Sequence, residues 1–250
     1  DQIEVTTPRS SAEAFRSIPG IRSESSGGEG NANIAVRGLP VAAGGAKFLQ
    51  LQEDGLPILQ FGDIAFGNAD IFLRLDSTMS SIESIRGGSA STLATNAPGG
   101  IINIISKTGE SDSGSVATTI GLDYDHTRTD FEFGGELNDS MYFHLGGFYR
   151  QGEGPREAGY TGNKGGQIKA NITKEFDKGY VRLYYKHLDD KTIAYLPMPA
   201  SSNGKSVGSF DPSSDTPHSA YFTSILSTDG NGNLRRADMR DGMNPTVDSV

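Results

Sequence analysis

The sequence predicts a two-part fold, in which a small mixed α+β domain is followed by consecutive long antiparallel strands. The first observation is a pair of short isoleucine-rich runs, 82–85 and 101–105, bounded by glycine and typical of buried strands. The second is a change after residue 113, where apolar and polar residues alternate over runs of about ten residues. The third is the count of 33 glycines, which favours many tight turns.

The composition excludes several classes of protein. Cysteine is absent, so neither a disulfide framework nor a thiolate metal site is expected. The 22 basic and 31 acidic residues give a net charge of −9, which argues against nucleic acid as a partner. No apolar run approaches the roughly 18 residues of a membrane helix. Because no nucleophile elbow, phosphate loop or metal-spaced histidine pair occurs, we expect no enzymatic activity, no cofactor and no metal.

The first predicted element is a short helix at residues 10–18. Ser10 and Glu13 have the spacing of a capping box, and Ala12, Phe15 and Ile18 recur along one side. Pro19 then ends the helix.

Four ordered segments resemble the plug domain of TonB-dependent outer-membrane receptors. They are IPGI at 18–21, NIAVRGL at 33–39, FLQLQEDGLPI at 48–58 and IESIRGGSASTLATNAPGGIINIISKTG at 82–109. The resemblance implies a mixed α+β plug domain at residues 10–110. It also implies that the first strands of a transmembrane antiparallel β-barrel follow, with roughly 22 strands in the complete receptor. The implied location is the outer membrane of a Gram-negative bacterium.

Residues 1–9 contain DQIEVTT, which is similar to the TonB box of this family. The resemblance implies that TonB, with its inner-membrane energising complex, captures this segment by strand addition. The TonB-contacting residues would be Ile3, Glu4, Val5 and Thr6. The alternative is that Ile3 and Val5 begin the first strand of the plug.

Two arginines at strand ends, Arg37 and Arg86, are expected to be buried. A buried guanidinium must be paired, and the resemblance implies that both latch the plug to carboxylates of the barrel wall. Glu83 is a candidate partner within the plug. The alternative is that both are ordinary surface arginines.

Two loops are candidate substrate contacts, because the resemblance places them at the outward apex of the plug. The first contains Glu29 and Asn31, and the alternative for it is a solvated connector. The second, 57–72, contains Phe61, Asp63, Phe66, Asn68 and Asp70. Aromatic faces beside carboxylates and amides suit sugars, so we expect a small to medium nutrient ligand and favour an oligosaccharide. A ferric siderophore is the alternative substrate, and a small core of phenylalanines is the alternative role of this loop.

Five barrel strands are expected within residues 111–190, each with an apolar and an ionic side. The apolar sides contain Val116, Ile120, Phe131, Phe133, Met141, Phe143, Leu145, Ile168, Ile172, Val181 and Leu183. Minimal turns at 138–139 and 177–179 alternate with long connections, the pattern of bacterial barrels whose long loops face outward. Outer-membrane lipid is therefore the expected partner of the apolar sides. The alternative is a soluble β-sandwich, as in a β-rich carbohydrate-binding protein.

Residues 191–250 are expected to form a long extracellular loop. Candidate substrate contacts in the outer loops are Arg156, Tyr160 and Tyr195, and a surface lipoprotein is a further candidate partner. The spacing of Asp229, Asn231 and Asn233 is that of a calcium loop, but a hairpin turn is favoured. Five strands are too few to close a plugged barrel, so we expect further strands beyond residue 250.

Overall fold

A computed structural model gives the fold of the chain. It describes residues 8–25, 29–30, 32–39, 48–59, 69–95, 97–154, 159–193, 226–228 and 234–236. The chain divides into two compact units, residues 1–192 and residues 193–250, which we describe separately.

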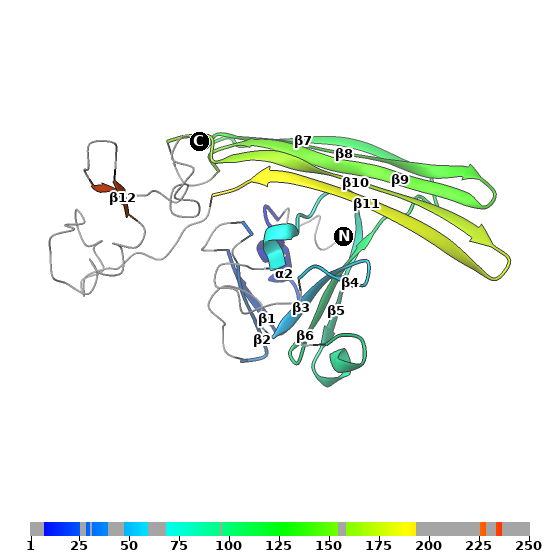
Figure 1. Cartoon of the computed structure of the whole chain (residues 1–250). Helices are drawn as coiled ribbons and strands as arrows, with labels where there is room; N and C mark the ends of the chain where they lie inside the picture. Colours follow the sequence, from blue (N-terminus) through cyan, green and yellow to red (C-terminus); the bar gives the residue numbers. More distant parts are fainter. Residues whose placement is uncertain are drawn as a thin grey trace. The chain divides into compact units, whose positions relative to one another are not determined.

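The first part of unit one is a small α+β domain, which we call the N-terminal domain (Figure 1). Its elements are α2 (Ser11–Phe15), β1 (Ile21–Glu24), β2 (Asn33–Val36), β3 (Leu49–Glu53), β4 (Leu56–Pro57), the 3-10 helix η1 (Ala69–Phe72), β5 (Met79–Arg86), the 3-10 helix η2 (Gly88–Thr92) and β6 (Gly100–Ser106). A four-stranded sheet has the order β4-β3-β6-β5, with β3 and β6 parallel, and β1 and β2 form a separate antiparallel pair.

The predicted helix begins directly after its N-cap residue, Ser10, and it is shorter than expected. The Glu13 N–H donates to the Ser10 Oγ at 3.3 Å, which satisfies one free donor of the first turn. The Glu13 carboxylate accepts from the N–H and the guanidinium of Arg9. The helix ends at Phe15 because Pro19 and Gly20 follow closely.

The core of the N-terminal domain lies between α2, the β1–β2 pair and the four-stranded sheet. Phe15, Leu51, Leu73 and Ile102 are at most 1% exposed within it. The run 101–105 forms the buried strand β6, as predicted, but the run 82–85 is only partly buried. The physical reason is that β5 is an edge strand of the sheet, so one side has no neighbouring strand.

The turn between β3 and β4 anchors this hairpin to the end of β6. Asp54 and Gly55 have φ values of 51° and 82°, as a two-residue hairpin turn of the primed type requires. The Asp54 carboxylate accepts from the N–H of Ser106 at 2.8 Å and from its hydroxyl at 2.7 Å. Glu53, immediately before the turn, is therefore held beside the carboxyl end of β6.

The second part of unit one is a five-stranded antiparallel sheet, as predicted. Its strands are β7 (Ser113–Ile120), β8 (His126–Asn138), β9 (Met141–Gly152), β10 (Asn163–Phe176) and β11 (Gly179–Lys191). They pair in sequence order, and two-residue turns join β8 to β9 and β10 to β11. We call this sheet the wall (Figure 1).

The wall has its apolar side exposed and its polar side buried. Val116, Leu183 and Phe133 are 76%, 66% and 60% exposed. Thr173 and Gln167, on the other side, are 0% and 2% exposed, because this side contacts the N-terminal domain. A soluble β-sandwich would bury the apolar residues instead, so the predicted barrel wall fits this arrangement and the sandwich does not.

Two short strands in unit two differ from the expectation of one uninterrupted loop. Leu226–Thr228 (β12) and Leu234–Arg236 (β13) pair antiparallel. They flank the segment where a hairpin turn was predicted, but Asp229, Asn231 and Asn233 themselves lie outside the described residues. In the described part of the chain, no helix is long and apolar enough to cross a membrane.

Candidate functional site

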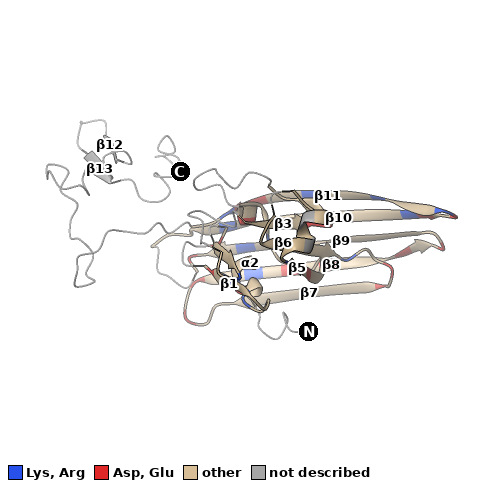
Figure 2. Ribbon diagram, turned by 90° about the horizontal axis from the view of Figure 1, so that it is seen from below, with Lys and Arg blue, Asp and Glu red and all other residues tan. Residues whose placement is uncertain are grey.

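The candidate site is the interface between the N-terminal domain and the polar side of the wall. Figure 2 shows acidic and basic positions on the strands of the wall, which lie behind the N-terminal domain in that view. The contacts across this interface are mainly ion pairs and hydrogen bonds, and they form groups along the strands.

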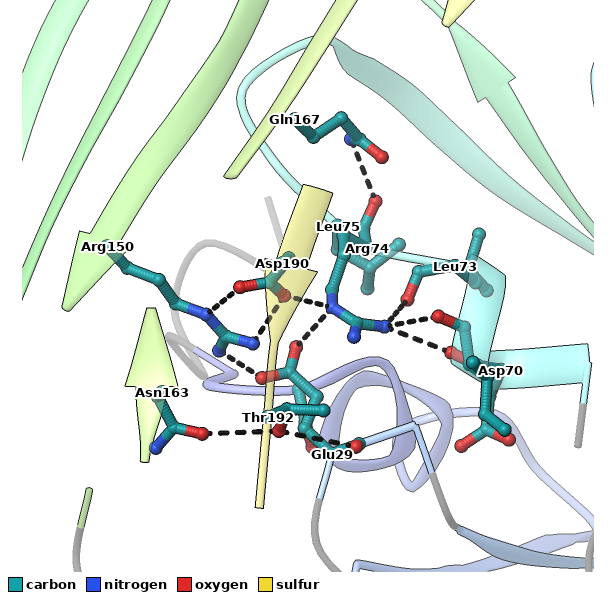
Figure 3. A network of polar contacts seen from close by, with 12 residues as sticks. Glu29, Asp70, Leu73, Arg74, Leu75, Arg150, Asn163, Gln167, Asp190 and Thr192 are labelled. Atoms are coloured by element: carbon teal, nitrogen blue, oxygen red, sulfur yellow. Dashed lines mark hydrogen bonds and ion pairs between the residues drawn. The ribbon is translucent and has the colours of Figure 1, made fainter. Parts of the chain in front are cut away.

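The group nearest the long β9–β10 connection contains four charges, and we call it the four-charge cluster (Figure 3). The Asp190 carboxylate accepts from the Arg74 Nε at 2.6 Å and from the Arg150 Nε and Nη2 at 2.9 and 2.6 Å. Glu29 pairs with Arg150 and lies 3.8 Å from the Arg74 Nε. The side chains of Arg74, Arg150 and Asp190 are at most 4% exposed. Buried charges need partners of opposite sign, and the cluster supplies them.

Arg74 also ties η1 to the wall. Its Nη1 donates to the carbonyl oxygens of Asp70, Ile71 and Leu73, at the end of η1 where carbonyls have no helical partner. Two residues after Arg74, the Asp76 carboxylate accepts from the Gln167 side chain of the wall at 2.7 Å. The segment after η1 is therefore fixed to strands β10 and β11 at two points.

Asp70 is a buried carboxyl group that joins two segments of the N-terminal domain. It is 2% exposed, and its Oδ2 accepts from the Ala32 N–H at 2.9 Å. Burial raises the pKa of Asp70 to about 6, although this hydrogen bond and the charge of Arg74 act in the opposite direction. The expected substrate contact is therefore not accessible at this residue.

The middle group has a carboxylate of the N-terminal domain between two lysines of the wall. Glu53 forms ion pairs of 2.6 Å with both Lys169 and Lys186. The ammonium group of Lys169 also donates to the Ser106 hydroxyl, and that of Lys186 to the Phe72 carbonyl. Burial alone would raise the pKa of Glu53, but the two ammonium groups outweigh burial and hold the pKa below its ordinary value.

A second carboxylate, Glu132 of the wall, joins the end of β6 to the neighbouring strand. It accepts from the Lys107 Nζ at 2.7 Å and lies 2.9 Å from the His144 Nε2. The Lys107 carbonyl accepts from the Asn171 side chain at 2.8 Å. Lys107, the residue that follows β6, is thus held to the wall through both its side chain and its backbone.

A cavity of about 480 Å³ lies beside the middle group, between the β3–β4 hairpin and strands β10 and β11. It is lined by Glu53, Asp54, Leu56, Pro57, Ile58, Phe72, Ser106, Lys169, Ala170, Asn171, Tyr184, Tyr185, Lys186 and Leu188. Charged, amide and aromatic groups therefore share one space at the interface.

The structure does not bury the arginines that were expected to latch the plug. Arg37 and Arg86 are exposed, and the Arg86 Nη1 donates to the Pro19 carbonyl at 2.6 Å. Glu83 is also exposed and accepts from the Asn103 side chain at 3.4 Å. The expectation of burial is wrong for both arginines. Arg37 follows the last residue of β2, and Arg86 is the last residue of β5, which is an edge strand of its sheet. Ion pairs to the wall are made instead by Glu29, Glu53, Arg74 and Lys107.

The remaining predicted site residues have different outcomes. Glu29 was expected to touch substrate, and the structure places it in the four-charge cluster. Tyr160 is half-buried in the connection between β9 and β10. The residues that lie outside the described part of the chain are Ile3, Glu4, Val5, Thr6, Asn31, Phe61, Asp63, Phe66, Asn68, Arg156 and Tyr195.

Comparison with known proteins gives one matching family and several similar solved structures. Residues 1–101 match the family model described as the TonB-dependent Receptor Plug Domain. The ferric yersiniabactin uptake receptor FyuA from Yersinia pestis is 21% identical, with 66% of this chain and 26% of that chain covered and a TM-score of 0.53. The siderophore receptor PirA from Acinetobacter baumannii is 22% identical, with 70% and 28% covered and a TM-score of 0.51.

The pyoverdine outer membrane receptor FpvA from Pseudomonas aeruginosa is 17% identical, with 69% of this chain and 24% of that chain covered and a TM-score of 0.56. No curated protein sequence matches the chain. The chain therefore spans about a quarter of the length of these three solved structures.

The N-terminal domain therefore has the fold of a plug domain, and the five antiparallel strands that follow it have the arrangement of a barrel wall. Residues 1–101 match the plug domain of TonB-dependent receptors, and the three solved structures share the fold of this domain and of the strands that follow it. From here we call the N-terminal domain the plug.

Proposed function

We propose that this chain is part of a receptor that takes up a nutrient across the outer membrane, with energy supplied through TonB. The observation that carries the proposal is that, among the described residues, ion pairs join the plug to the wall, whereas the apolar core clusters consist of plug residues alone. When such an interface separates, water can solvate the charged groups on both sides, so the plug can move without exposing a large apolar surface.

TonB is the proposed partner of residues 1–9. In strand addition, backbone N–H and C=O groups of the captured segment bond to the edge of a sheet. Proline lacks the N–H and disrupts such a ladder. In the intact receptor, Val5→Pro is therefore expected to abolish uptake while ligand binding at the cell surface is kept. The control is Val5→Ile, which keeps both the N–H and the branched side chain; equal loss of uptake by both variants would contradict the role of this segment.

For the substrate we propose an anionic ferric chelate of the siderophore class. Its support is that the similar structures are named as receptors for ferric yersiniabactin, a siderophore and pyoverdine. The oligosaccharide hypothesis depends on the composition of the loop 57–72, whose Asp70 is buried. It remains the second candidate.

The test is uptake by cells that express the intact receptor, with and without TonB, using a panel of radiolabelled ferric chelates and oligosaccharides. We expect TonB-dependent uptake of a chelate. TonB-dependent uptake of a glycan alone would overturn the substrate class, and the absence of any TonB-dependent uptake would overturn the function.

A further inference from the structure

Two lysines of the wall lie directly opposite each other on neighbouring strands. Lys169 of β10 and Lys186 of β11 are partners in the register, and both point to the plug side. Like charges at directly opposite positions repel each other. A sheet that carries such a pair on its inner side needs a counter-ion there, and the wall itself does not supply one among the described residues.

The counter-ion comes from the plug. In the part of the chain that the structure describes, Glu53 is the one carboxylate that pairs with either lysine, and each of its oxygens lies 2.6 Å from one ammonium group. Glu53 stands at the end of β3, next to the turn at Asp54 and Gly55. Movement of the β3–β4 hairpin would therefore remove the counter-ion of both lysines in one step.

The surroundings of the two ammonium groups suit an anion larger than a carboxylate. The Ser106 hydroxyl lies 2.9 Å from the Lys169 Nζ, and the cavity of about 480 Å³ opens beside both lysines. Tyr184, whose hydroxyl can donate a hydrogen bond, lines the same cavity. Space and the positive charge of two lysines thus meet at one place on the inner side of the wall.

We propose that Lys169 and Lys186 form a binding site for a carboxylate- or phosphate-bearing anion, which Glu53 of the plug occupies while the plug is in place. The part of the proposal that concerns transport rests on the proposed function and refines its substrate class: an anionic ligand, unlike a neutral glycan, gains two cationic contacts along the wall. The site itself can be tested without transport.

The first experiment labels lysines in the purified intact receptor with pyridoxal 5′-phosphate, a phosphate-bearing aldehyde, followed by borohydride reduction and peptide mass spectrometry. Glu53→Gln keeps the side-chain shape and removes the charge. We expect labelling of Lys169 and Lys186 to rise about tenfold relative to the wild type, the factor that corresponds to roughly 1.4 kcal/mol of site affinity. Inorganic pyrophosphate should suppress this labelling by competing for the same site.

The matched control is Glu24→Gln, which removes a partly exposed carboxylate of the plug whose partner is Arg22. It should leave labelling at the wild-type level. If Glu53→Gln fails to fold, Glu53→Asp serves instead, because its shorter carboxylate cannot reach both ammonium groups equally and should give intermediate labelling. Wild-type labelling in a folded Glu53 variant, or labelling that pyrophosphate does not suppress, would overturn the site.

The second experiment compares uptake by Glu53→Gln and by the triple variant Glu53→Gln, Lys169→Gln, Lys186→Gln. Both lack the Glu53 charge, but only the triple variant lacks the anion site. We expect the triple variant to take up an anionic chelate several-fold more slowly, with unchanged affinity at the cell surface. Equal rates would overturn the role in transport, whereas a wild-type receptor without TonB-dependent uptake would overturn the proposed function and leave the labelling result valid.

Discussion

At the scale of single residues, Asp70 is the group whose protonation should affect the stability of the plug. Its pKa is about 6 in the folded chain, above the ordinary 3.8, so the folded state holds the proton more tightly than the unfolded state. The contribution of Asp70 to the free energy of unfolding should therefore be largest below about pH 4 and should be lost as the pH rises through about 6, by roughly 3 kcal/mol in total. Above that pH the contribution of Asp70 is constant.

Asp70→Asn should remove this pH dependence, because the amide stays neutral and its oxygen can still accept from the Ala32 N–H. The measurement is pulse proteolysis of the plug in urea at about pH 4.5, 5.5, 6.5 and 7.5, two values on either side of the expected transition. Relative to the wild type, Asp70→Asn should gain stability as the pH rises. Parallel pH profiles of the two proteins would show that Asp70 does not control this dependence, and Glu24→Gln should follow the wild type.

The residues that hold the plug could be predicted from the sequence only by type. Arg37, Arg74 and Arg86 all follow apolar runs, and sequence reasoning selected the first and the third. Among the described contacts, Arg74 is the one of the three that pairs with the wall, and its partner Asp190 lies 116 residues further along the chain. An ion pair between such distant positions depends on how the plug sits against the strands, which no local pattern contains.

At the scale of elements, the β3–β4 hairpin depends on backbone geometry at Gly55. This glycine has a φ of 82°, and nothing lies within 4 Å of the position where a Cβ would be. Gly55→Ala should therefore destabilise the plug through the left-handed backbone alone, by about 1–2 kcal/mol. The urea midpoint of plug proteolysis measures this loss.

Gly88 is the matched control for the hairpin. It also has open space around the Cβ position, but its φ lies outside the left-handed region. Gly88→Ala should leave the urea midpoint unchanged. If both alanine variants shift the midpoint equally, the loss comes from alanine at a glycine site in general and not from the turn.

The strands of the wall were predicted well because alternation is a local signal. Each strand has an apolar side and a polar side, and a slip of one residue would exchange them, so the pattern determines which side faces the plug. Burial of β5 was predicted less well, because its place at the edge of the sheet depends on strand order. The short strands β12 and β13 lack a sustained alternation and were missed for that reason.

At the scale of the whole molecule, the wall is a sheet whose buried side is ionic and whose exposed side is apolar. Charges on its inner side are compensated by charges of the plug, as at Asp190 with Arg74 and at Lys186 with Glu53. A buried ion pair adds little to stability compared with apolar packing, but loss of one partner leaves an uncompensated charge. The plug should therefore be held by matching charges and released when they are mismatched.

Asp190→Asn tests this statement at the most buried carboxylate of the interface. The side chain of Asp190 is 0% exposed and accepts from both Arg74 and Arg150, so its loss leaves two guanidinium groups with Glu29 as their nearest carboxylate. Removal of one partner of a buried pair typically costs about 3–5 kcal/mol. The plug should become sensitive to protease at clearly lower urea concentration, while the wall stays folded in detergent.

Asp189→Asn is the matched control, because Asp189 is the preceding residue of the same strand and is exposed. Both variants lose one negative charge at nearly the same place, so general electrostatics would change equally. A lower urea midpoint for Asp190→Asn alone would show that the pairing with Arg74 and Arg150 holds the plug. If the two midpoints agree, water enters the four-charge cluster and screens it, and the plug must then be held by the remaining contacts at Glu53 and Lys107.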